Sequence, residues 1–166
     1  MQSIDQRWDI KHYRNGKLIW EVIEKPNRLV DTGELAVVDT FYRNKASNYF
    51  GMTDFWIGLY NGTLSEESVL STVPGEPVGN GYARQQVERS EIGWPTMAQD
   101  ENGDWQVTSK TLTLAADGGS IGPINGAFLC TSSDNSGVLI AGVSIGLSRT
   151  ILAGDFVTFN IKARIR

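Results

Sequence analysis

The sequence has little of the chemistry on which most reactive sites depend. Its 166 residues include one cysteine, Cys130, and one histidine, His12. A single cysteine excludes a disulfide within the chain and a cysteine metal cluster, and a single histidine excludes a histidine-pair metal site. Cys130 lies in the apolar run GAFLC, which predicts a small core residue. We therefore expect no metal and no cofactor.

Long apolar runs and an excess of basic charge are also missing. No segment approaches the ~20 apolar residues of a membrane span, and MQSIDQRWDIK lacks the apolar region of a signal peptide. The formal net charge of −4 and the pI near 5.0 provide no long-range attraction for nucleic acid or an anionic membrane. We expect a soluble protein made in a cytoplasm, with neither nucleic acid nor membrane as a partner.

Motifs for nucleophilic or phosphate chemistry are absent as well. There is no G-x-S-x-G elbow, and the only histidine lies in a predicted hairpin. The stretch VGNGYARQQV, residues 78–87, lacks the Gly-Lys-Ser/Thr of a phosphate loop, and the residues after Gly81 alternate like a strand. A carboxylate pair for glycoside hydrolysis stays open, because nineteen acidic residues offer many pairs. We expect a protein that is not an enzyme and has no catalytic residues.

What the sequence does contain is an alternation of apolar and polar residues, the pattern of half-buried strands. It is clearest in FVTFNIKARIR, where Val157, Phe159 and Ile161 alternate with polar residues after the turn AGD. Further strands are predicted in FWIGLYN, GYARQQVER, DWQVTSKTLTL, NGAFLCTS and GVLIAGVSI. This spacing predicts a mainly β fold, an antiparallel β-sandwich or jelly-roll-like barrel, as a single domain over residues 1–166.

The N-terminal residues 1–23 predict a β-hairpin. A two-residue Asn15-Gly16 turn mixes apolar and charged residues on both faces, so we favour a three-residue loop that begins at Arg14 and collects the apolar side chains on one face. The favoured register pairs Trp8 with Val22, Ile10 with Trp20 and His12 with Leu18. His12 then flanks an apolar face as a packed residue. The hairpin either packs on its own domain or reaches to a neighbouring subunit as an arm.

Two features interrupt the strand pattern. One short helix is predicted at about residues 32–44, because Asp31 and Glu34 resemble a capping box before a helical apolar spacing. The apolar positions are Leu35, Val38 and Phe41 or Tyr42. Residues 61–80 predict a long connection, of the kind that is usually functional or mobile.

The five tryptophans divide into two groups. Trp8, Trp20 and Trp56 fall within strand patterns and are predicted to be core residues. Trp94 and Trp105 flank the turn-rich GWPTMAQDENGDW, so they are the candidates for exposed stacking residues, with Tyr60, in a carbohydrate-binding module.

Five segments in a fixed order are more informative than any single motif. They are LIWEVIEKPNRLVDTGELAVVDTFY, DFWIGLYNGT, GNGYARQQV, LTLAADGGSIGPINGAFLCTS and LIAGVSIGLSRTILAGDFVTFNIKARI. This order resembles a family of small structural proteins encoded by tailed bacteriophages, over nearly everything from Leu18 to Arg166. The chain departs from the family at Arg28, an extra arginine in NRLV, and at LTLAAD, which is less aromatic; the hairpin up to Tyr13 lies outside the resemblance.

The resemblance implies a non-enzymatic virion component that assembles in many copies. The role we expect is a capsid decoration (cement) protein that binds the outer surface of the major capsid protein lattice as a homo-oligomer, most simply a trimer. A place in the neck, collar or tail, or a carbohydrate- or receptor-binding module, remains the alternative. The candidate assembly contacts are Arg84, Lys162, Arg164, Arg166, Glu66, Glu67 and Glu76.

Overall fold

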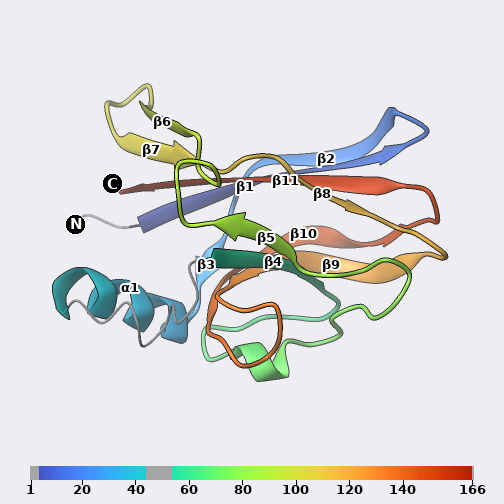
Figure 1. Ribbon diagram of the computed structural model, residues 1–166, viewed down its shortest axis with the longest axis horizontal. Helices are drawn as coiled ribbons and strands as arrows, with labels where there is room; N and C mark the ends of the chain where they lie inside the picture. Colours follow the sequence, from blue (N-terminus) through green and yellow to red (C-terminus); the bar gives the residue numbers. More distant parts are fainter. Residues whose placement is uncertain (1–3, 44–53, 166) are drawn as a thin grey trace.

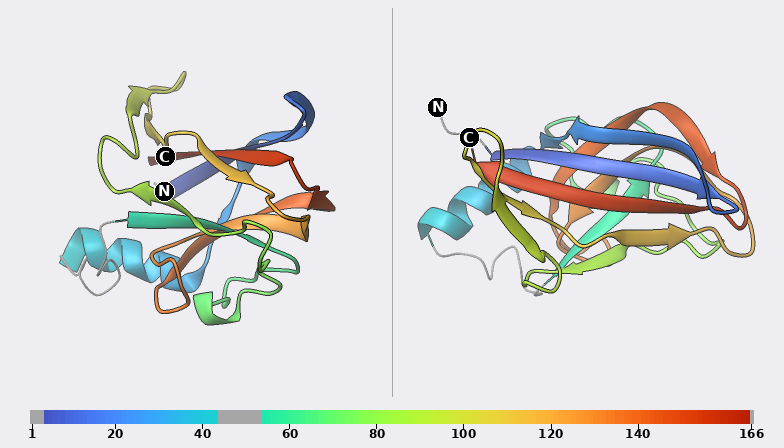
Figure 2. Two further views of the ribbon diagram at one scale, coloured as in Figure 1. Left: turned by 45° about the vertical axis from the view of Figure 1, so that its right-hand side comes forward. Right: turned by 90° about the horizontal axis from the view of Figure 1, so that it is seen from above.

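Two antiparallel sheets pack face to face in the computed structural model, which describes residues 4–43 and 54–165 (Figure 1). The first sheet has the order β2-β1-β11-β7-β6, with β8 also paired to β11, and the second has the order β3-β10-β9-β4-β5. The two layers are seen edge-on in Figure 2. The predicted β-sandwich is confirmed, and the barrel alternative is wrong, because the two sheets do not close into one.

The strands have the following bounds. The first sheet contains β1 (Ile4–Arg14), β2 (Lys17–Pro26), β6 (Thr96–Gln99), β7 (Trp105–Thr108), β8 (Leu112–Ala115) and β11 (Phe156–Ile165). The second contains β3 (Arg28–Leu29), β4 (Asp54–Tyr60), β5 (Gln85–Glu88), β9 (Ile121–Cys130) and β10 (Leu139–Ile151). The helix α1 spans Asp31–Arg43, and a single 3-10 turn spans Leu70–Thr72.

The core lies between the sheets and follows the predicted alternation. Val157, Phe159 and Ile161 of β11 are fully buried, and so are Trp8 and Ile10 of β1. The opposite sheet contributes buried residues from its central strands, Ile57, Leu59, Ala127, Leu129, Ala141 and Val143. At ~25 cal/mol per Å² of apolar area removed from water, burial of these side chains is the main favourable term in folding.

The N-terminal hairpin is part of the first sheet, and its predicted register is wrong. Asn15 and Gly16 both have positive φ and form a two-residue turn that pairs Arg14 with Lys17. A bulge beyond the next pair then shifts the register by one residue, so that His12 faces Trp20 and Ile10 faces Val22. The bulge places the apolar side chains on one face and still allows the two-residue Asn15-Gly16 turn. β1 is also registered with β11 over ten pairs.

The helix has its predicted position but a different buried face. Gly33 and Ala36 are buried, whereas Leu35 is 54% exposed. A Cβ at Gly33 would lie 2.0 Å from the carbonyl oxygen of Ile140, so a glycine is needed for this close approach to β10. The side chains of Val38, Phe41 and Tyr42 lie outside the described residues.

Two strand predictions need correction. The strand predicted in GYARQQVER begins only at Gln85. The side chains of Tyr82 and Arg84 form polar contacts with Glu76, and neither residue is part of the strand. DWQVTSKTLTL divides into β7 and β8, which pair with different halves of β11. The 61–80 segment packs on the domain through Leu64, Leu70 and Val73.

Candidate functional site

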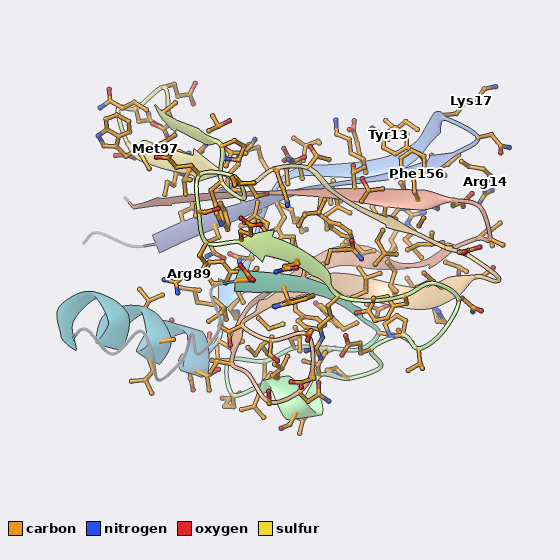
Figure 3. All side chains as sticks on the ribbon, in the orientation of Figure 1. Tyr13, Arg14, Lys17, Arg89, Met97 and Phe156 are labelled. Atoms are coloured by element: carbon orange, nitrogen blue, oxygen red, sulfur yellow. The ribbon has the colours of Figure 1, made fainter. Side chains whose placement is uncertain are left out.

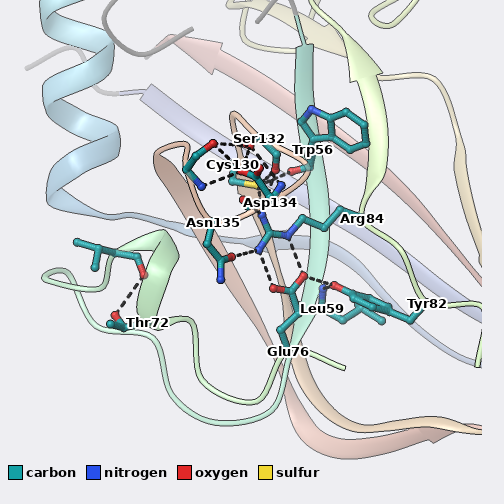
Figure 4. A network of polar contacts seen from close by, with 12 residues as sticks. Trp56, Leu59, Thr72, Glu76, Tyr82, Arg84, Cys130, Ser132, Asp134 and Asn135 are labelled. Carbon is teal, nitrogen blue, oxygen red and sulfur yellow. Dashed lines mark hydrogen bonds and ion pairs between the residues drawn. The ribbon is translucent and has the colours of Figure 1, made fainter. Parts of the chain in front are cut away.

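Arg84 lies at the centre of a polar network that joins three segments (Figure 4). Its guanidinium forms a bidentate pair with the carboxylate of Glu76, with Nε at 2.8 Å and Nη2 at 2.7 Å from the two oxygens. The same group donates to the carbonyl of Ser132 at 3.0 Å, to the carbonyl of Asp134 and to Oδ1 of Asn135 at 2.6 Å. It also lies over the ring of Phe128, 5.2 Å from the centroid. The Arg84 side chain is 4% exposed, so its charge is paired with groups of its own chain rather than presented to solvent.

Neighbouring groups in this network are held in their neutral forms. Burial raises the pKa of Tyr82, whose hydroxyl donates to Glu76 at 2.7 Å and accepts the backbone N–H of Leu59 at 2.9 Å. Burial also raises the pKa of the Cys130 thiol to about 11, which removes its nucleophilic thiolate at neutral pH. A hollow of about 620 Å³ lies beside the network. The Arg84 donors point to protein acceptors, so the arrangement ties loops together.

The basic residues of β11 are also paired internally. Lys162 bridges Asp9 and Glu24, and Arg164 pairs with Asp5 at 3.0 Å and with Asp100 at 2.7 Å. Lys162 and Arg164 alternate with the buried residues of β11, so these pairs lie on the outer face of the first sheet. Arg166 lies outside the described residues.

The other two candidate contacts are acids of the 61–80 segment. Glu66 pairs with Arg28 at 3.4 Å, with both side chains mostly exposed. A hydrogen bond with Ser65 lowers the pKa of Glu67. Of the candidate assembly contacts on described residues, these two acids are the most open to solvent.

Sequence reasoning missed a second buried ion, Asp155. Nε2 of His12 lies 2.8 Å from its Oδ2, and Arg14 forms a bidentate pair with the same carboxylate at 2.9–3.1 Å. The Arg14 hydrogen bonds, helped by His12 and opposed by burial, lower the pKa of Asp155 to about 2. The turn AGD before β11 was the one sign in the sequence that Asp155 is important. Its partners His12 and Arg14 lie more than 140 residues earlier in the chain.

The aromatic stacking candidates lie in three environments. Tyr60 is buried, 3% exposed, with its hydroxyl directed to the carbonyl of Val143. Trp94 is half-buried against Phe55 with an edge-on ring contact at 6.0 Å. Trp105 is 62% exposed. Of the predicted core tryptophans, Trp8 is fully buried, and Trp20 and Trp56 are half-buried.

An apolar cleft opens between the sheets at one end of the molecule. Its volume is about 300 Å³, and it is lined by Gln6, Phe55, Arg89, Trp94, Val107, Leu129 and Ala163. Arg89 lies over the Phe55 ring, 5.6 Å from its centroid. Beyond the cleft, β6 and β7 form a ribbon that stands off the sandwich (Figure 1). Met97 of this ribbon is 71% exposed.

Among the described residues, no group of three His, Cys, Asp or Glu side chains is placed to hold a metal ion, and no helix is long and apolar enough to cross a membrane. Several acids pair with basic side chains: Asp155 with His12, Glu76 with Arg84, Asp9 with Lys162 and Asp5 with Arg164. The buried Asp54 accepts a hydrogen bond from the Gln86 amide. No protein-family model matches the chain, and no curated protein matches its sequence.

Proposed function

We propose that the chain is a non-enzymatic structural protein of a tailed-phage particle, a decoration protein that binds the outer surface of the major capsid protein lattice as a symmetric homo-oligomer and stabilises the head. The particle surface is then its working location. Neck, collar or tail is the alternative location.

One observation carries this proposal. The segments in which the chain resembles the phage family contain the residues that hold the sandwich together. Arg84 comes from GNGYARQQV, Asp155 comes from the AGD turn, and Gly58 comes from DFWIGLYNGT. A Cβ at Gly58 would lie 2.3 Å from the Phe128 ring. The resemblance to the phage family thus includes positions with structural roles, which supports a shared structural scaffold. A scaffold that coats a lattice needs broad contact surfaces rather than a reaction site.

The direct test is a cryo-EM reconstruction of the intact particle. Density for the chain at symmetry-related positions over the whole shell is the expected result. A single ring of about six or twelve copies places the protein at the neck or tail, as the alternative requires. A particle that contains no copy overturns the proposal.

A binding assay gives the functional side of the same test. Purified protein added to particles that lack it is expected to co-sediment with them and to raise the temperature at which they release DNA. Particles with an unrelated capsid protein serve as the control and are expected to leave the protein in the supernatant.

Trp105 favours a second candidate function, a carbohydrate- or receptor-binding module. Its large, exposed ring on a projecting ribbon is the type of surface on which sugars stack. A glycan array with the wild type and Trp105→Ala tests this candidate. Binding that is lost in the variant supports it, and no binding by the wild type removes it.

A further inference from the structure

The β6–β7 ribbon carries two exposed apolar side chains, Met97 at 71% and Trp105 at 62%. Val107 lies opposite Met97, and side chains two residues apart on a strand share a face, so Trp105, Val107 and Met97 point the same way. Val107 lines the cleft between the sheets, which identifies this direction as the inner one. The apolar lining of the cleft therefore continues outward onto Met97 and Trp105. We call this continuous surface the cleft end.

The opposite end of the molecule carries a convex apolar feature. Leu18 and Ile19, directly after the β1–β2 turn, are each 47% exposed. Figure 3 shows Lys17, Arg14, Tyr13 and Phe156 gathered at this tip, with Met97 at the far end of the molecule. Tyr13 and Phe156 stack at 4.9 Å between ring centroids and support the base of the tip. We call this feature the hairpin end.

The two ends carry exposed side chains of opposite charge. The loop between β6 and β7 reads Asp100-Glu101-Asn102-Gly103-Asp104, with three acids. One of them, Asp100, is paired with Arg164, and Glu101 is exposed. At the hairpin end Lys17 is exposed and Arg14 is 40% exposed beside the buried Asp155. The cleft end is concave and aromatic, with Arg89 in its lining and the exposed Glu101 on its rim, whereas the hairpin end is convex and aliphatic, with the exposed Lys17 beside it. The two ends are therefore complementary in shape and polarity, and Glu101 and Lys17 are complementary in charge.

We infer that the cleft end of one copy binds the hairpin end of a second copy. Leu18 and Ile19 of one protomer enter the cleft beside Phe55 and Trp94 of the next, and Lys17 faces the acidic β6–β7 loop. Well-packed, desolvated pockets near the centre of an interface, surrounded by a polar rim, carry most of the binding energy.

Contact between like ends is disfavoured. Two hairpin ends would bring Lys17 and Arg14 of both copies together, and two cleft ends would oppose their acidic loops and their concave surfaces. A head-to-tail contact closes into a ring when the rotation between copies is a simple fraction of a turn, as it is in a trimer. This inference rests on the homo-oligomer part of the proposed function.

The first experiment measures the mass of the purified chain by sedimentation velocity and native mass spectrometry, without any phage particle. A closed oligomer of the wild type is expected. Leu18→Asp and Met97→Asp, both at exposed positions, are each expected to give folded monomers, as checked by circular dichroism. A monomeric wild type, or a Leu18→Asp variant that still assembles, overturns the inference. Particle binding tests the proposed function separately.

Mixing the two monomeric variants tests the head-to-tail geometry. Leu18→Asp retains an intact cleft end and Met97→Asp an intact hairpin end, so one good interface remains and the mixture is expected to form a one-to-one dimer. Contacts between like ends predict no such dimer, and its absence overturns the geometry.

A charge exchange tests the rim in low-salt buffer, where surface charges are least screened. Lys17→Glu and Glu101→Lys are each expected to weaken association about tenfold, and the double variant is expected to restore it. Glu34→Lys, on the exposed side of α1, is the matched control and should leave association unchanged. Failure of the double variant to recover, or an equal effect of the control, overturns the charge complementarity.

Discussion

Arg84 and Asp155, two of the buried ionisable side chains in this sandwich, have opposite charges and differ in the partners that surround them. Arg84 is a cation whose partners are one carboxylate, two backbone carbonyls and an amide oxygen from neighbouring loops. Asp155 is an anion whose partners are two basic side chains of β1 and the backbone N–H of Leu152. Both centres are almost fully buried, at 4% and 2% side-chain exposure.

The difference lies in what remains after the central ion is lost. Around Arg84, the carbonyls belong to folded loops and stay in place without a donor, while Glu76, 21% exposed, keeps its charge. Around Asp155, the Arg14 side chain is 40% exposed and reaches water by a small movement. Arg84 serves four acceptor groups at once, so its loss leaves more groups without a partner than the loss of Asp155 does. We therefore expect the Arg84 network to stabilise the fold more than the Asp155 network.

Replacement of Arg84 by methionine gives the largest expected effect. Arg84→Met retains much of the volume but leaves Glu76 without its cationic partner and two loop carbonyls without a donor, which should lower the free energy of unfolding by about 3–5 kcal/mol. Urea denaturation measures it. Arg28→Met is the matched control, since Arg28 is 66% exposed, and should change stability by less than about 0.5 kcal/mol. A loss below about 1 kcal/mol for Arg84→Met would contradict the comparison.

Replacement of Asp155 by asparagine is expected to cost less. Asp155→Asn keeps the shape and one acceptor oxygen but removes the charge that holds His12 and Arg14, so we expect a loss of about 2 kcal/mol in the same urea assay. The His12 ring stays buried beside the new amide, which accounts for most of the loss. A cost equal to that of Arg84→Met would reverse the proposed ranking.

Acidification tests the Asp155 network by titration. The pKa of Asp155 is lowered to about 2, so its ionised form stabilises the fold above the unfolded-state value of about 4, and this stability is lost as the pH falls from about 4 towards 2. Asp134, in the loop that caps Arg84, behaves similarly because Ser132 and Ser136 lower its pKa to about 2. Unfolding free energy measured between pH 6 and 2 should decline in this window. The decline should be shallower in Asp155→Asn, and an unchanged slope would show that Asp155 does not contribute to it.

The smallest expected effect comes from Arg14. The Arg14 side chain is 40% exposed and its pair with Asp155 is screened by solvent, so Arg14→Ala should destabilise the fold less than Asp155→Asn does, while the contact between His12 and Asp155 remains. Lys17→Ala, three residues along at the same tip, is the control and should be neutral within about 0.5 kcal/mol. Thermal denaturation of both variants measures the loss of stability. A larger loss of stability for Arg14→Ala than for Asp155→Asn would make Arg14 the centre of the network.

Local patterns determined much of the fold. Alternation in FVTFNIKARIR predicted the buried face of β11, and the helix boundaries were predicted to within one residue at each end. The hairpin was predicted, but its register was not. A bulge combines the Asn15-Gly16 turn with an apolar face, and this bulge has no signature in the sequence. The helix face was mistaken because the close approach to β10 selects Gly33 and Ala36 over the larger Leu35.

The sequence by itself determined that this chain is mainly β with a short helix, since strand and helix periodicities are local properties of the chain. Only the tertiary structure decided which charges meet. The register of β1 with β11 brings His12 and Arg14 to Asp155, and the packing of the 61–80 segment brings Glu76 to Arg84. Ion pairs depend on distances of a few ångströms between residues far apart in the chain, and composition and spacing do not contain those distances.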